Sequence, residues 1–443
     1  MFSCQVPDLF VVIQQCIGFF FVLAAYNGQI FIVVAVLRNL ASDEIYGISD
    51  QSGYYTSSIL CLSFTLSNFL APPILARIGP KWAMVIGALF YALYMFGFLY
   101  LRGWLLYTLA LLLGIGSALI WTGNGVNLVR HTPKHHMHRN NGIMWTGLQM
   151  ALIAGALFLA IVLQTSDLVS SYQLVYAVFG ILALIGAVIL ACLPKGSGTE
   201  KSDGLEEQST KEVFARTFSL VKTRKMLMLT VVTCFLGAEG VFHSGVYGAA
   251  LAATTRLQRN EVGIAYNVLA LGLGEIIGGL LFGVGAKTKS PYGRRIVVLM
   301  GTVLLVLGFL MSFLFLPVDS PQKKTDEIAF IEPTLWFSLA TAFVFGLGDS
   351  CWQTQAYTIA GGIYKDKDAA PAFALFQFFQ AGSAGICFYI SSILNLYWQL
   401  GLLSIFAILS TIAFYILQQW ALEEQNIDKV TSQEEIKPEN SEI

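Results

Sequence analysis

The stretch FGLGDSCWQTQAYTIAGG, residues 345–362, places polar side chains inside an apolar helix. It belongs to a longer apolar segment, 334–360, and about 20 such residues are enough to cross the hydrocarbon core of a bilayer. The stretch also contains a carboxylate, Asp349, which is costly inside a membrane unless it is paired or hydrated. It therefore predicts a membrane-spanning helix with one face turned toward the protein interior or toward water.

The whole chain has the composition of a membrane protein. Of its 443 residues, 56% are hydrophobic and only 12% are charged, whereas a soluble domain carries about 25% charged residues. The net charge of −1 gives no field that would attract nucleic acid. The partner predicted by composition is thus the lipid bilayer and not nucleic acid. Twelve segments are predicted to span it: 9–37, 54–76, 82–101, 104–129, 142–164, 172–193, 226–252, 261–286, 295–317, 334–360, 370–394 and 397–420.

The polar breaks divide the chain into two halves. The longest break, 194–225, begins Gly/Ser-rich and charged and then becomes basic and amphipathic, which is typical of a linker. It separates an N-terminal six-helix bundle, 1–193, from a C-terminal six-helix bundle, 226–420. The polar tail 421–443 is predicted to be disordered.

The distribution of basic residues predicts the orientation. If both termini are cytoplasmic, 20 of the 26 Lys and Arg residues fall on the cytoplasmic side. Such an excess is the usual signature of the inside face. The linker and the tail are then cytoplasmic as well.

The two halves repeat each other at the same spacing. GIGSALIWTGNG (114–125) in the fourth span matches GLGDSCWQTQ (346–355) in the tenth, and Asn124 has a counterpart three residues after Trp352. Asn68 of the second span aligns with Glu275 of the eighth, and Gln149 of the fifth aligns with Gln380 of the eleventh. Transporter folds are commonly built from such duplications. The prediction is an all-α membrane protein with twelve transmembrane helices in the major facilitator fold, made of two six-helix pseudo-repeats.

Several stretches resemble one family within that superfamily. The chain is similar to the Unc-93-like (ion channel regulatory protein) family in FHSGVYGA (242–249), GLGEIIGGLLFG (272–283), GLGDSCWQTQ (346–355), APAFALFQFFQ (370–380), GPKWAM (79–84) and RNNGIMW (139–145). The loop between the second and third spans, ILARIGPK (74–81), matches the superfamily's loop pattern only in part, because Ala76 stands where an aspartate is expected. The resemblance implies a twelve-helix protein without enzymatic activity. It also implies relatives that regulate potassium channels or help receptors to traffic.

Three acids are candidates for a functional role. Asp349, Glu275 and Glu239 each lie roughly 20–22 Å into their spans by helix rise, near the middle of the membrane. Glu239 and His243 are four residues apart and share a helix face. Such a pair can pass or store a proton, and the competing interpretation is a neutral hydrogen-bonded pair that fixes helix packing. The remaining candidates for coupling or cavity lining are Asn68, Asn124, Trp352, Gln353 and Gln380.

Other chemistry is not expected. The sequence contains no nucleophile triad, phosphate loop or HExxH motif, so we predict neither an enzyme nor a cofactor. The histidine-rich stretch RHTPKHHMHRNN (130–141) lacks cysteine and acid and contains repelling basic residues, so we predict no metal site there.

Two functions remain open. The first is a regulator or orphan transporter with a midplane central cavity. Its partner would be another membrane protein, a channel or receptor, or a small solute. The alternative is a proton- or cation-coupled secondary transporter of a small organic solute. Aromatic side chains such as Trp352 then either stack on the solute or only pack the helices.

Overall fold

The computed structural model describes residues 8–41, 46–132, 137–165, 168–194, 210–257, 262–283, 291–364 and 368–435. Its regular structure in those ranges is helical, apart from one isolated bridge between Thr254 and Thr325. The helices of the first half are α1 (Asp8–Ile30), α2 (Val33–Leu40), α3 (Ser52–Ser67), α4 (Ala71–Gly97), α5 (Gly103–His131), α6 (Met137–Thr165) and α7 (Leu168–Ala191). Those that follow are α8 (Thr210–Val221), α9 (Arg224–Val241), α10 (Tyr247–Ala253), α11 (Val262–Gly278), α12 (Pro291–Phe315), α13 (Leu335–Ile363), α14 (Ala369–Ser391) and α15 (Leu396–Glu435).

Within the described residues, 11 helices are long and apolar enough to cross a membrane. The remaining predicted span, 54–76, is divided between α3, which has 16 residues, and the first turns of α4. The break follows from Pro72 and Pro73, which have no N–H to donate to the preceding turn. A second bend falls at Gly79, whose φ of 80° lies in the left-handed region. The predicted boundary between 54–76 and 82–101 therefore becomes a bend inside α4.

Two other spans are interrupted where they face the second half or the core. α1 and α2 are separated at Phe31 and Ile32. α9 and α10 are joined by a π-helical turn, Phe242–Val246, in which the Ser244 hydroxyl donates to the Gly240 carbonyl over 2.5 Å. A π turn inside a membrane helix is often found at a functional site, and this one contains His243.

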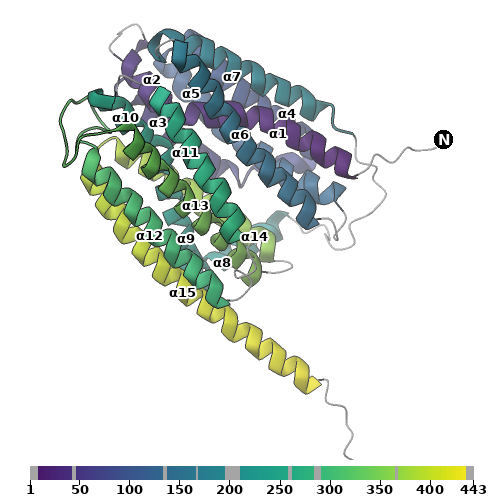
Figure 1. The fold of residues 1–443 in the computed structure, drawn as a ribbon. Coiled ribbons are helices and arrows are strands. Elements are labelled where there is room, and N and C mark those ends of the chain that lie inside the picture. Colours follow the sequence, from purple (N-terminus) through teal and green to yellow (C-terminus); the bar gives the residue numbers. More distant parts are fainter. Residues whose placement is uncertain are drawn as a thin grey trace, which may run out of the picture.

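The two halves pack against each other through equivalent elements. α3 contacts α14, and α6 contacts α11. α3 and α11 belong to the second and eighth spans, and α6 and α14 are the fifth and eleventh. Each half therefore offers the same two elements to its partner, as expected for a six-plus-six repeat. Figure 1 shows the purple-to-blue helices of the first half beside the green-to-yellow helices of the second.

At one end of the molecule the halves are tied by hydrogen bonds to a single carbonyl. The Arg38 guanidinium of α2 and the Tyr54 hydroxyl of α3 both donate to the carbonyl oxygen of Pro321, which lies between α12 and α13. Arg38 is 8% exposed and therefore buried in this contact. It lies on α2, a short helix that continues the first span.

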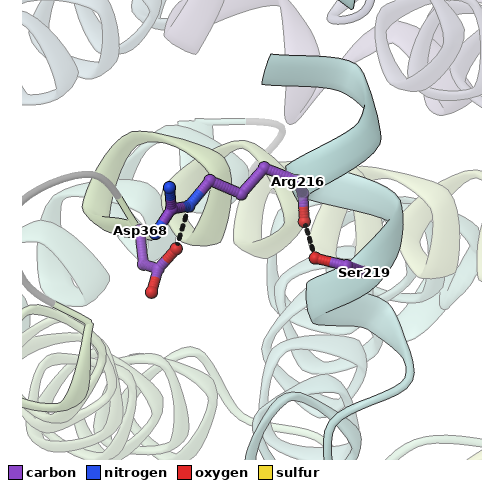
Figure 2. Close-up of polar contacts among 3 residues, drawn as sticks. All are labelled: Arg216, Ser219 and Asp368. Carbon is purple, nitrogen blue, oxygen red and sulfur yellow. Dashed lines mark hydrogen bonds and ion pairs between the residues drawn. The ribbon is translucent and has the colours of Figure 1, made fainter. Parts of the chain in front are cut away.

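The linker contributes a helix of its own. α8 packs on α14, and Arg216 Nε donates to Asp368 Oδ1 over 2.5 Å, as Figure 2 shows. The same figure shows the Ser219 hydroxyl donating to the Arg216 carbonyl within α8. The hydrogen bond to Asp368 raises the pKa of the Arg216 guanidinium. An exposed pair of this kind contributes little to stability, and its effect is to fix where α8 lies. Linker residues 195–209 lie outside the described part.

The C-terminal helix is longer than the sequence indicated. α15 continues through the polar residues to Glu435 and extends past the other helices in Figure 1. Residues 421–435 are thus helical here, whereas the sequence analysis expected disorder from 421 onward. The 40 residues of α15 span about 60 Å at the usual helix rise, twice the hydrocarbon thickness. Residues 436–443 lie outside the described part.

The backbones of α11 and α13 approach closely through two glycines. A Cβ on Gly346 would overlap the Leu271 carbonyl, and one on Gly274 would overlap the Phe343 carbonyl. Small residues allow membrane helices to pack at this distance. Gly274 ends one Gly-Leu-Gly motif (272–274) and Gly346 begins the other (346–348), and Glu275 and Asp349 directly follow these motifs.

Replacing Gly346 with alanine should therefore destabilise the protein, by about 1–3 kcal/mol, because the new methyl group meets backbone and not a side chain that can rotate. The measurement is thermal unfolding of the purified protein in detergent. Gly401→Ala on α15 is the matched control, since nothing lies within 4 Å of a Cβ there. Equal melting temperatures for the two variants would contradict the close α11–α13 contact.

Candidate functional site

The structure brings together three ionisable side chains from two spans. Glu239 is near the end of α9, His243 lies in the π turn that follows, and Asp349 is midway along α13. His243 Nε2 is 3.7 Å from Glu239 Oε1. One ligand-type atom from each of the three residues lies within 4.8 Å of those of the other two. We call Glu239, His243 and Asp349 the acid–histidine cluster.

The cluster is buried and its polar atoms are mostly unpartnered. Glu239 is 1% exposed and Asp349 is 7% exposed. Both carboxylate oxygens of Glu239 and the Nδ1 atom of His243 lack a hydrogen-bond partner. Asp349 is better satisfied, because Gln353, one turn further along α13, donates to its Oδ1 over 3.1 Å. Among the ion pairs of the described residues, His243 is the only cationic partner of any cluster carboxylate.

Glu275 lies beside the cluster but has its own partner. It follows Gly274 on α11 and is half-buried. Its carboxylate interacts with the amide of Gln149 on α6, across the interface between the halves. Glu275 therefore couples the charged region of the second half to a neutral side chain of the first.

A small recess of about 10 Å³, with room for about one water molecule, lies next to His243. Its wall also includes Tyr247 of α10, Asn267 of α11 and Phe31 from the turn between α1 and α2. In the described part of the chain the structure does not show the wide central cavity that the sequence analysis expected. Tyr247 shares the helix face of Glu239 and His243, but its hydroxyl donates to the Ser338 carbonyl over 2.8 Å and so turns away from the cluster.

The first half has amides where the second half has charge. Gln15 Nε2 donates to Asn124 Oδ1, and Asn127 Nδ2 donates to Gln15 Oε1, each over 2.6 Å. Asn124 was a sequence candidate, whereas Gln15 was missed although it lies in the first apolar segment and is fully buried. The signal that would have found it is its amide within that segment.

Two other candidates lie apart from the cluster. Asn68 is in the turn that separates α3 from α4, and its buried Nδ2 atom has no hydrogen-bond partner. Gln380 is half-buried on α14, and its backbone carbonyl accepts the Ser383 hydroxyl. Of the histidine-rich stretch, residues 133–136 lie outside the described part, and His131 Nδ1 is 2.9 Å from the Asn127 carbonyl.

Trp352 is held by packing. It is fully buried, and its ring meets Phe235 of α9 at 5.2 Å and Phe414 of α15 at 6.1 Å, both edge-on. Edge-to-face contacts of this kind stabilise a core. They favour the packing interpretation of Trp352 over stacking on a solute.

Comparison with known proteins places this architecture in a family. Residues 44–415 match the family described as ion channel regulatory protein UNC-93. The chain belongs to the UNC-93 family. Two relatives described as UNC93-like protein MFSD11 are similar over nearly the whole length. The one from Xenopus tropicalis is 33% identical, covering 92% of this chain and 95% of the relative, and the one from Xenopus laevis is 31% identical, covering 93% and 96%.

A solved structure confirms the fold of this UNC-93 family member. A POT family transporter in complex with a thioalcohol-conjugated peptide superposes with a TM-score of 0.69. The match covers 94% of this chain and 96% of that one at 13% identity. Such a low identity shows the major facilitator fold and nothing about the substrate.

The packing role of Trp352 gives a direct test. Trp352→Ala should cost about 3–5 kcal/mol of unfolding free energy, because it leaves a large cavity between α9, α13 and α15. Trp336→Ala on the same helix is the control, since Trp336 is 81% exposed and should change stability little. Thermal unfolding in detergent separates them. A Trp352→Ala protein as stable as the control would show that the ring has another role.

Proposed function

We propose that this UNC-93 family protein is a cation-coupled carrier of the major facilitator type, in which the acid–histidine cluster binds the coupling cation. The observation that carries the proposal is the burial of two carboxylates, Glu239 and Asp349, without a Lys or Arg ion-pair partner among the described residues. The site is asymmetric, because the repeat position equivalent to Asp349 is Ser117 in the first half.

The physical argument is one of charge compensation. Two carboxylates at this separation repel each other and lose their hydration on burial. A bound cation offsets both the repulsion and the lost hydration. It therefore stabilises the conformation in which the cluster is buried over a conformation in which water reaches the cluster. A ligand shifts a conformational equilibrium through just such a difference in affinity. The hydrogen bonds from Arg38 and Tyr54 to Pro321 are the contacts that must break when that end of the molecule opens.

The fold is consistent with this role. The superposed structures include proteins described as a POT family transporter and the nucleoside transporter NupG. We extend the class of activity to this chain because its cluster lies in the second half, beside the interface where α6 meets α11. Its solute is a separate question.

The family description supports a second candidate. The UNC-93 family is described as ion channel regulatory proteins, so the same fold would bind a channel in the membrane. In that role the cluster fixes the packing of α9 on α13, and α8 and α15 provide the surfaces outside the bilayer. The two candidates differ in whether any solute crosses the membrane.

Potential-driven uptake tests the carrier proposal. Proteoliposomes with an interior-negative potassium diffusion potential should accumulate a labelled solute from a panel of amino acids, nucleosides and dipeptides. The potential drives in any coupling cation. Asp349→Asn should reduce this uptake at least tenfold, since a neutral amide no longer attracts the cation.

Glu332→Gln is the control, because the Glu332 side chain is 72% exposed and makes only a surface pair with Arg256. It should transport like the natural protein. Uptake that is independent of potential, or retained in Asp349→Asn, would contradict the coupling role. Absence of uptake across the panel together with a channel that co-purifies in stoichiometric amount would favour the regulator.

We also propose that both termini are cytoplasmic, which is supported by the 20 of 26 basic residues that this orientation places inside. An epitope tag after Ile443 should then bind antibody only in permeabilised cells. A tag in the segment 326–328, whose residues are exposed in the same connection between α12 and α13, should bind without permeabilisation. The reverse pattern would invert the topology.

A further inference from the structure

We propose that Glu239, His243 and Asp349 form a binding site for a divalent transition-metal cation of the Zn²⁺ or Mn²⁺ class. The inference rests on the proposed function in taking the same cluster as the cation site, and it adds the chemical identity of the cation. No metal site is predicted at these residues from the sequence pattern. Asp349 lies far along the chain from the other two residues and joins them through the packing of α13 on α9.

The donor set has the composition of a metal site. Two carboxylates and one imidazole offer three ligand atoms within 4.8 Å of one another. Zinc bonds to nitrogen and oxygen of about 2.0–2.2 Å place neighbouring ligands of a tetrahedron about 3.3–3.6 Å apart. His243 Nε2 and Glu239 Oε1 are 3.7 Å apart. That separation is too long for a hydrogen bond and close to the span across one metal ion.

An independent observation points to a ligand between these groups. Glu239 is 1% exposed, neither of its oxygens has a hydrogen-bond partner, and its carboxylate is aimed at His243 and Asp349. A buried polar group without a partner costs free energy, and a buried carboxylate costs more. Among the described residues, the Glu239 side chain otherwise pairs only with another acid, Asp349. A cation between the three side chains would satisfy both carboxylates.

Charge selects a dication. The two carboxylates carry −2 and a metal-bound imidazole is neutral, so one M²⁺ makes the site neutral, whereas one proton leaves −1. Mg²⁺ and Ca²⁺ prefer six or more oxygen ligands. A mixed set of imidazole and carboxylate suits first-row transition metals better. Glu275 is not needed as a ligand, because it interacts with Gln149.

The surroundings orient the ligands. Gln353 donates to Asp349 Oδ1, and hydrogen bonds of this kind orient a ligating carboxylate. The small recess has His243 in its wall, so among the three cluster residues the imidazole is the one that borders it. The π turn that contains His243 sets its side chain relative to Glu239.

Metal binding can be measured without any transport assay. The full-length protein in detergent is stripped with EDTA and titrated with Zn²⁺ and with Mn²⁺ by calorimetry, and bound metal is counted by mass spectrometry. A triple variant, His135→Gln, His136→Gln and His138→Gln, serves as background, because the histidine-rich stretch is another possible source of binding. We expect about one metal per chain in this background. X-ray absorption should show nitrogen and oxygen ligands at about 2.0–2.2 Å.

Adding Asp349→Asn or Glu239→Gln to that background should weaken the affinity at least tenfold, and Glu275→Gln should leave it unchanged. The melting temperature of each variant without metal checks that it is folded, and metal should raise it only where the site is intact. Absence of stoichiometric metal in the background protein, or equal affinity after Asp349→Asn, would overturn the inference. Metal binding without solute uptake would support the metal site and contradict the carrier proposal. Solute uptake without metal binding would contradict only the metal site.

Discussion

The close packing of α11 on α13 is the contact on which the charged part of this protein depends. Gly274 and Gly346 let the two backbones meet, and Gly348 lets α13 approach Leu305 of α12 as well. α13 is therefore fixed on two sides, and the next residue, Asp349, has one defined position relative to α9. A larger residue at Gly274 or Gly346 would push α11 and α13 apart and so move Asp349, since the nearest atoms at these two positions belong to backbone.

Burial and charge oppose each other at this position. A membrane protein has no water in its hydrocarbon region to satisfy a polar group, so every such group must find its partner inside the fold. Most groups here do so: Tyr247 reaches Ser338, Gln15 reaches Asn124, and Gln353 reaches Asp349. Several other described side chains, such as Asn68 and Trp352, leave one buried polar atom without a partner. Glu239 differs from them because it is a carboxylate whose nearest polar neighbour is another acid, Asp349. Its position is therefore the place where the proposed cation would complete the contacts of the buried side chains.

The sequence predicted the parts of this arrangement that depend on neighbours along one helix. The spans, the repeat and the shared face of Glu239 and His243 follow from apolar length and helical spacing. The approach of Asp349 to that face depends on how α13 packs on α9, which no local pattern encodes. Burial of Arg38 was missed for the same reason, because α2 is covered by elements distant in sequence. Pro72 and Pro73 could have predicted the division of the second span. Hydropathy alone does not show it, because hydropathy takes no account of the backbone N–H that proline lacks.

The amide network of the first half has a consequence for how the molecule responds to its surroundings. Gln15, Asn124 and Asn127 hold one another through side chains that neither gain nor lose charge. The network itself therefore does not respond to a change in pH or membrane voltage. The buried acids Glu239 and Asp349 belong to the second half, so a change in their charge reaches the network through the contacts of α14 with α3 and of α11 with α6.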